Sequence, residues 1–365
     1  MSIKNPFILI AALSITAQAG LAQVTGINST VIQPSTDVTV TVPFTQNSEG
    51  SFAATGTTAT TINVAGPLTS GQFGTVTVGS GGNIRTFTRF YLRMTSGSAN
   101  GRWSSITAND ATSFTLEDTT FLAQIVAGNT FNVYRHQTLA SVFPDEFENY
   151  SFKRSVGIQS NGTQVIFRSL TAIGINKSAS QTFFFHSSGT WRQIGVGTTP
   201  FDEQPIEPQR SFIIRNQTPS GAAASDLVFT SMGRVETGTQ VTRLPFGASG
   251  TDNDLGVGIG VPVDITLRQL NLAGTSGFVT TTNILQVRDT VLVFDNSQPG
   301  LNKSSSASYF VLSNASTGNV PQWRRIGGGS TNFDNQIIPA GAAIQIRKKA
   351  VSPGGVANWT QTVPF

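Results

Sequence analysis

Apolar positions in this chain alternate with polar positions over short stretches and do not recur at helical spacing. After residue 22, no window of about 15 residues carries the stripe of an amphipathic helix. Short runs rich in β-branched and aromatic residues recur instead, bounded by Gly, Asn, Ser and Pro. These runs include residues 38–42, 75–78, 88–94, 130–134, 164–167, 182–185, 212–215, 290–294, 308–312 and 343–347. The pattern predicts an all-β protein.

The first 22 residues have the pattern of a secretory signal peptide. Lys4 precedes an apolar run from Phe7 to Thr16, and small residues follow it up to Ala22. This run is too short for a membrane span, and no later run approaches the ~18 apolar residues that a spanning helix needs. We therefore expect an exported protein without a transmembrane helix, located outside the cell or on its surface, with the periplasm as the remaining alternative.

An internal repeat organises the second half of the chain. Segments 191–215 and 323–347 are identical at 12 of 25 positions without a gap. Upstream, Ile-Asn-Lys-Ser at 175–178 matches Leu-Asn-Lys-Ser at 301–304, and the offset between the copies grows from 126 to 132 residues between the two matches. The six additional residues are expected at a hairpin tip just before the Trp of the second copy. The repeat predicts two homologous β-modules.

The N-terminal third of the chain has a different pattern. Its short strands are separated by tight turns, and they lie at 90–94, 102–106, 113–116 and 131–135. This arrangement predicts an antiparallel β-meander or a small barrel. We therefore divide the chain into a signal peptide (1–22), an N-terminal β-module (23–140) and two homologous β-sandwich- or barrel-like modules (141–249 and 250–365).

The composition restricts the chemistry that the chain can carry. Its 365 residues include no Cys and two His, 12% are charged, and the net charge is +4. The absence of Cys excludes disulfides, thiolate metal sites and Cys nucleophiles. The basic residues are scattered, whereas a nucleic-acid site needs them concentrated. We expect no cofactor, no metal and no nucleic-acid partner.

No catalytic motif stands out in the sequence. His136 and His186 lie at the ends of predicted strands, and the chain has no G-x-S-x-G nucleophile turn, so we expect both to be structural. Asp252-Asn-Asp254 opens like a calcium loop. However, Val263 occupies the twelfth position, where an EF-hand needs Glu. The prediction is a protein without catalytic residues.

The repeat supplies the candidate binding residues, which are Trp191, Arg192, Asp202, Trp323, Arg324 and Asp334. An exposed Trp can stack on a sugar, but a repeated Trp within an apolar strand more often packs in a core. The two Asp residues could bind calcium or a sugar hydroxyl, although capping a turn through their own backbone is the favoured interpretation. Arg215 and Arg347 end their strands, where a structural ion pair and a ligand contact both remain open.

Three segments of the N-terminal module resemble a hairpin module of phage-tail and bacterial surface β-proteins. They are Ser-Gly-Ser-Ala-Asn-Gly-Arg at 96–102, Ile-Thr-Ala-Asn-Asp at 106–110, and Gly128-Asn129, where that module usually has Gly-Asp. Over residues 35–365, this module and the later Trp-Arg…Gly…Asp…Ile-Arg block are similar to an uncharacterised family of exported proteins known mainly from verrucomicrobial bacteria. The resemblance implies an extracytoplasmic location and no known chemistry.

Our leading hypothesis is an exported, non-enzymatic protein with a structural or adhesive role at the surface or outside the cell. Cell-envelope polysaccharide and other surface proteins are the expected partners, and a homo-oligomer remains open. The alternatives are a carbohydrate-binding array using Trp191 and Trp323, an outer-membrane β-barrel, and an uncharacterised hydrolase. Pro364 beside Phe365 speaks against the outer-membrane barrel, because Pro cannot donate to a closing strand.

Overall fold

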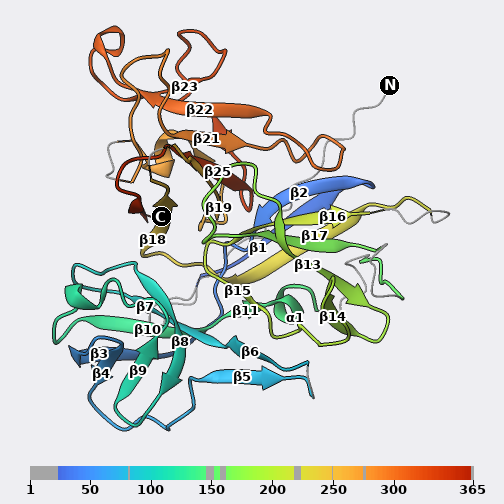
Figure 1. Ribbon diagram of the computed structural model, residues 1–365, viewed down its shortest axis with the longest axis vertical. Helices are drawn as coiled ribbons and strands as arrows, with labels where there is room; N and C mark the ends of the chain where they lie inside the picture. Colours follow the sequence, from blue (N-terminus) through green and yellow to red (C-terminus); the bar gives the residue numbers. More distant parts are fainter. Residues whose placement is uncertain are drawn as a thin grey trace.

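The computed structural model describes residues 24–80, 83–144, 152–156, 162–217, 223–248, 250–273 and 277–362. The predicted signal peptide, 1–22, lies outside these residues. Nearly all regular structure in these residues is β-strand, and the one α-helix among them is the single turn α1 (Leu139–Val142). Three bodies are visible in Figure 1, a barrel at the lower left and two sheet bodies above and to its right. The all-β prediction is confirmed.

The barrel is closed by six antiparallel strands. Their order is β10 (Thr130–Arg135), β3 (Ser48–Thr57), β4 (Thr61–Val64), β9 (Ser113–Leu116), β8 (Trp103–Asn109) and β7 (Phe90–Met94). Leu92, Phe114 and Phe131 are fully buried inside it, and the rings of Phe114 and Phe131 meet edge to face. The prediction of an N-terminal meander or small barrel is confirmed.

A hairpin leaves the barrel and covers part of the next body. It consists of β5 (Thr75–Val78) and β6 (Arg85–Thr88), which pair only with each other. Phe87 on β6 packs against Phe201, with ring centroids 5.9 Å apart. The hairpin therefore contributes apolar side chains to a core outside the barrel.

The first sheet body contains a five-stranded antiparallel sheet with Trp191 and Phe183 in its core. The strand order is β14 (Thr190–Gln193), β13 (Ala179–His186), β12 (Gln164–Arg168), β16 (Ser211–Asn216) and β2 (Thr36–Thr41). Two smaller pairs complete it, β1 (Thr25–Ile32) with β17 (Leu227–Arg234), and β11 (Gln137–Thr138) with β15 (Pro205–Ile206).

Strands β1 and β2 precede the barrel in the chain but belong to the first sheet body. The sequence-based division places them in a separate module of residues 23–140. In the structure, β1 pairs with β17 and β2 pairs with β16, so strand pairing crosses that boundary. The barrel is thus inserted between β2 and β11.

The second sheet body has the same strand order as the first. Its sheet runs β23 (Gln322–Arg325), β22 (Ala307–Leu312), β21 (Thr290–Val293), β25 (Ala343–Lys348) and β19 (Asn253–Gly258). Its smaller pairs are β18 (Thr239–Phe246) with β26 (Gly355–Thr362), and β20 (Ile265–Thr266) with β24 (Ile337–Ile338). The β22–β23 connection, 313–321, is six residues longer than its counterpart, 187–189, as the offset in the repeat predicts.

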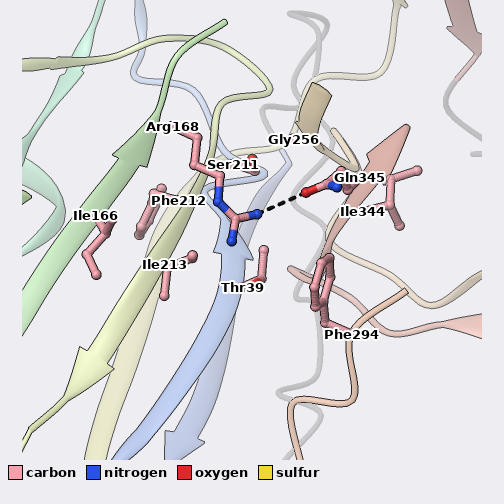
Figure 2. A pocket seen from close by; sticks show the side chains of 10 residues that line it. All are labelled: Thr39, Ile166, Arg168, Ser211, Phe212, Ile213, Gly256, Phe294, Ile344 and Gln345. Atoms are coloured by element: carbon pink, nitrogen blue, oxygen red, sulfur yellow. Dashed lines mark hydrogen bonds between the residues drawn. The ribbon is translucent and has the colours of Figure 1, made fainter. Parts of the chain in front are cut away.

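The two sheet bodies meet through equivalent strands. The N–H of Thr41 donates to the carbonyl of Gly341 (3.1 Å), and the N–H of Gly258 donates to the carbonyl of Gln209 (2.8 Å). Figure 2 shows Arg168 of β12 reaching across this interface, where its Nη1 lies 2.9 Å from Oε1 of Gln345 on β25. The two backbone bonds are reciprocal, since each body supplies one donor and one acceptor at equivalent positions.

Two ion-pair groups, which we call clasps, reinforce the interface. In the first clasp, Arg215 binds the Asp37 carboxylate through Nε (2.7 Å) and Nη2 (2.8 Å). Asn302 of the second body joins them, because its N–H donates to Asp37 (2.7 Å) and its side-chain oxygen accepts from Arg215 (2.7 Å). Arg215 therefore makes a structural ion pair.

The second clasp is the counterpart of the first with the bodies exchanged. Arg347 binds Asp254 through Nε (2.7 Å) and Nη2 (2.9 Å). Asn176 of the first body donates its N–H to Asp254 (2.7 Å) and accepts from Arg347 through its side chain (3.2 Å). Asn176 and Asn302 come from the two matching Asn-Lys-Ser segments, and both adopt a left-handed backbone, with φ of 49° and 52°.

Candidate functional site

The repeated tryptophans are core residues. Trp191 is 1% exposed and Trp323 is 2% exposed, and they belong to the separate cores of the two sheet bodies. Neither indole face is open to a ligand, so the idea of a carbohydrate-binding array built on these two residues is wrong. The interpretation that a repeated Trp packs in a core describes them correctly.

The repeated aspartates hold the loops that return to the Trp strands. Asp202 Oδ1 accepts the N–H of Trp191 (3.2 Å), and Asp334 Oδ1 accepts the N–H of Trp323 (2.8 Å). Each bond reaches a residue eleven positions back in the chain, rather than the expected two positions ahead. Burial raises the pKa of Asp202, and the bond from Trp191 opposes this effect.

The repeated arginines have different surroundings. Arg192 is partly exposed and donates to the Ser188 hydroxyl (3.2 Å). Arg324 is buried and donates to the side chain of Gln322 (2.8 Å) and to the carbonyl of Ser330. Because each arginine is engaged close to its own turn, the structure brings the repeated residues together within each copy and does not gather the two copies into one site.

The sequence resembling a calcium loop is also engaged in contacts within the protein. Asp252 accepts from Lys349 Nζ (2.7 Å) and from the N–H of Ala350 (3.1 Å). Asp254 is part of the second clasp. Within the described residues, no group of three or more His, Asp or Glu side chains is placed to hold a metal ion.

A large cavity in the described part of the chain is a cleft where the three bodies meet. We call it the central cleft, and its volume is about 610 Å³. The barrel supplies residues 102–105 and 117–120, the first sheet body supplies residues 170–171 and 207–209, and the second supplies Val241, Thr242, Arg243, Pro245, Leu255, Gly256, Val257 and Val356. Its size is within the range of about 300–1,000 Å³ that is typical of ligand sites.

Close contact between the barrel and the second sheet body forms one side of the central cleft. The N–H of Val241 donates to the carbonyl of Gly101 (3.1 Å), and Arg243 Nη1 lies 2.8 Å from Asp118 Oδ2. Gly101 has a φ of 83°, and a Cβ on it would lie 2.8 Å from the carbonyl oxygen of Thr239. Glycine is therefore required where the barrel hairpin docks.

A buried amide network joins the first and second sheet bodies beside the cleft. Gln209 donates from Nε2 to Gln240 Oε1 (2.7 Å) and accepts from the hydroxyl of Thr242. Gln240 then donates to the carbonyl of Gly260 (3.0 Å). Because all of these bonds are made inside the protein, they fix the position of this wall of the cleft.

Trp103 is the aromatic residue that lines the central cleft. It begins β8 and is partly exposed, whereas Trp191, Trp323 and Trp359 are all 2% exposed or less. Its ring lies edge-on to Tyr91, with centroids 6.0 Å apart. Trp103 lies outside the repeat and is not among the candidates drawn from it; the available signal was an Arg-Trp pair directly after the 96–101 hairpin tip.

Arg102, Glu117 and Thr119 line the cleft beside Trp103 and have free polar groups. Their side chains make no hydrogen bond or ion pair with another described residue, and burial lowers the pKa of Arg102 against the opposing charge of Asp118. An arginine nevertheless stays charged at physiological pH. The cleft thus offers free donors, a free carboxylate and a hydroxyl.

Ser105 and His136 form a dyad at the cleft wall, with Ser105 Oγ 3.3 Å from Nε2 of His136. The His136 ring is fully buried, and burial lowers its pKa to about 3. Its Nδ1 has no hydrogen-bond partner among the described residues, whereas a hydrolytic triad places an orienting acid there. His186, the other histidine, binds Ser188 within a turn.

We expect His136 to make the protein sensitive to mild acid. Below pH 6.5 an unfolded His binds a proton that the buried ring does not bind, so stability falls with decreasing pH, by up to about 1.4 kcal/mol per pH unit. Thermal unfolding between pH 7 and pH 5 should show a smaller decrease in Tm for His136→Gln than for the wild type. His186→Gln is the control and should keep the wild-type slope; equal slopes for all three proteins would contradict the prediction.

Comparison of the chain with protein-family models, with curated proteins and with solved structures found no match. None of the helices in the described residues has the length and apolar character needed to cross a membrane. We therefore infer function from the geometry of the central cleft.

Proposed function

We propose that the chain is an exported, non-enzymatic protein with an adhesive role at the cell surface or outside the cell, and that the central cleft holds its partner. The observation that carries this proposal is the cleft itself, in which three bodies with separate cores close around one space of ligand-site size. A cleft whose walls come from three folded bodies has a defined shape, and this suits it to binding a partner.

The rigid attachment of the three bodies supports a binding role. Arg93 of the barrel lies 2.7 Å from Glu236, which follows β17, and both side chains are largely buried. Tyr134 of the barrel also donates to Glu236 (3.2 Å). Together with the two clasps, these contacts hold the cleft in one shape, and a preorganised site loses less conformational entropy when it binds.

The pairing of two of the carboxylates around the cleft supports a role without catalysis. Asp118 is bound to Arg243, and Glu207 lies 3.1 Å from Arg210. Each of these carboxylates is paired with an arginine of the protein. Such a pair holds the surrounding structure in place and is less suited to transferring a proton. The signal-like N-terminus supports export, since its short apolar run and small residues match a secretory signal.

We also propose that the two sheet bodies arose from one duplicated module. The shared strand order, the reciprocal clasps and the equivalent Trp–Asp bonds all support this origin. In this proposal the barrel entered the first copy between β2 and β11, which correspond to β19 and β20 of the second copy.

Location and adhesion can be tested separately. Protease treatment of intact producing cells should release peptides of this chain, and fractionation should recover the protein at the surface or in the medium. A pool confined to the periplasm would contradict the surface role. Beads coated with the folded protein should bind cell envelopes, while beads coated with heat-unfolded protein serve as the control; equal binding of both would contradict an adhesive function.

A further inference from the structure

We propose that the central cleft binds an oligosaccharide segment of a polysaccharide, with Trp103 as the stacking platform. This inference rests on the proposed function in that it takes the cleft as the binding site. It assigns carbohydrate recognition to Trp103, which lies outside the repeat, instead of to the buried Trp191 and Trp323.

Trp103 has the surroundings that a sugar platform needs. Its ring makes T-shaped contacts with Tyr91 and with His136, whose ring centroids lie 6.0 Å and 6.3 Å away. Trp103 is partly exposed and lines the cleft, and its N–H makes no hydrogen bond with another described residue. A rigid ring with an apolar face and a free polar tip matches a pyranose, which presents C–H groups on its face and hydroxyls at its rim.

The free polar groups beside Trp103 match the hydrogen-bonding character of sugar hydroxyls, which both donate and accept. Arg102 offers a planar set of N–H donors, Glu117 offers a carboxylate acceptor, and the Thr119 hydroxyl can do both. None of these side chains has a hydrogen-bond partner among the described residues. A ligand with several hydroxyls can therefore satisfy them together.

The rest of the wall favours a sugar over an extended peptide. Pro208, Pro245 and Val257 give apolar surface on the facing walls. Strand β8, which carries Trp103, is paired on both sides, with β7 and with β9. A peptide that binds by strand addition needs an open edge, which β8 does not provide.

The test uses the full exported chain and a panel of hexasaccharides, namely neutral cello-, chito- and xylo-oligomers together with alginate and pectin oligomers that carry carboxylates. Because Trp103 is the only tryptophan of the four that is more than 2% exposed, iodide quenching of fluorescence should report on it selectively. A bound sugar should protect Trp103 from iodide, and calorimetry should give the affinity. The acidic and neutral members show whether Arg102 contacts a hydroxyl or a carboxylate.

Trp103→Ala should weaken binding of the preferred oligomer at least about tenfold, whereas Trp103→Tyr, which keeps an aromatic face, should remain within about threefold of the wild type. Arg102→Gln should also weaken binding, and most strongly for an acidic oligomer. Arg268→Gln removes an exposed arginine that does not line the cleft and is the control, which should bind like the wild type.

Two results would overturn the oligosaccharide assignment. One is that no panel member binds the wild type at concentrations up to about 1 mM. The other is that Trp103→Ala binds as tightly as the wild type. Surface location and bead adhesion are measured without added oligosaccharides, so a failure of the oligosaccharide assignment is distinguishable from a failure of the proposed function. Adhesion that persists in Trp103→Ala would direct attention to a protein partner and would also contradict this assignment.

Discussion

Asp37→Ala should destabilise the first sheet body and its interface by about 3–5 kcal/mol. The Asp37 side chain is 6% exposed and receives two hydrogen bonds from Arg215 and one from the backbone of Asn302. Removing this carboxylate leaves the Arg215 guanidinium, only 18% exposed, without its counter-charge. The loss is large because the remaining charge stays buried and keeps its desolvation cost, while the attraction that offset this cost is gone.

Thermal unfolding and hydrogen exchange provide the measurement. Exchange should accelerate in β2 and in the 300–304 segment, since both lose the carboxylate that joins them. Asp295→Ala is the control: Asp295 also accepts a backbone N–H, from Ser297 (2.9 Å), but it lies in an exposed turn and should cost less than about 0.5 kcal/mol. Similar, small changes in both variants would show that the first clasp contributes little.

The second clasp allows an internal comparison. Asp254 is 2% exposed and has the same set of partners as Asp37, with Arg347 and Asn176 in place of Arg215 and Asn302. Asp254→Ala should therefore resemble Asp37→Ala in size. Because both clasps hold one interface, the double variant should lose less than the sum of the two single losses.

Local pattern was sufficient to predict the strands and insufficient to predict their partners. Runs such as 75–78 and 164–167 correspond closely to observed strands, since alternation and β-branched residues are properties of neighbouring positions. The pairing of β1 with β17 joins residues about 200 positions apart, and nothing near either strand specifies the other. For the same reason the insertion of the barrel between β2 and β11 was not predicted.

The candidate site shows a similar division. Identity between the repeats drew attention to Trp191, Asp202 and their counterparts. These residues are identical because both sheet bodies need the same core packing and the same turn, and not because they bind a ligand. The clasp asparagines, Asn176 and Asn302, were visible as a matched segment, yet their carboxylate partners lie in strands with different flanking sequences. Trp103 belongs to the barrel, so comparison of the repeats could not reveal it.

Lys348→Met should have an effect as large as loss of a clasp, about 3–5 kcal/mol, because it leaves a buried carboxylate unpaired. Lys348 Nζ binds Asp289, which is fully buried, and also donates to the carbonyl of Gly277 (2.7 Å). Asp289 further accepts the N–H groups of Val279 (2.7 Å) and Lys349 (2.8 Å), but these dipoles do not replace the lost positive charge.

The first sheet body provides a matched rescue for this variant. At the positions of Lys348 and Asp289 it has Asn216, also fully buried, and Thr163, whose hydroxyl accepts the N–H of Lys153 (3.1 Å). The double variant Lys348→Asn, Asp289→Thr introduces these two neutral side chains and should recover most of the stability that Lys348→Met loses, as measured by thermal unfolding. If the double variant is no more stable than Lys348→Met, the buried charge pair is not the source of the loss, and packing around β25 is the alternative cause.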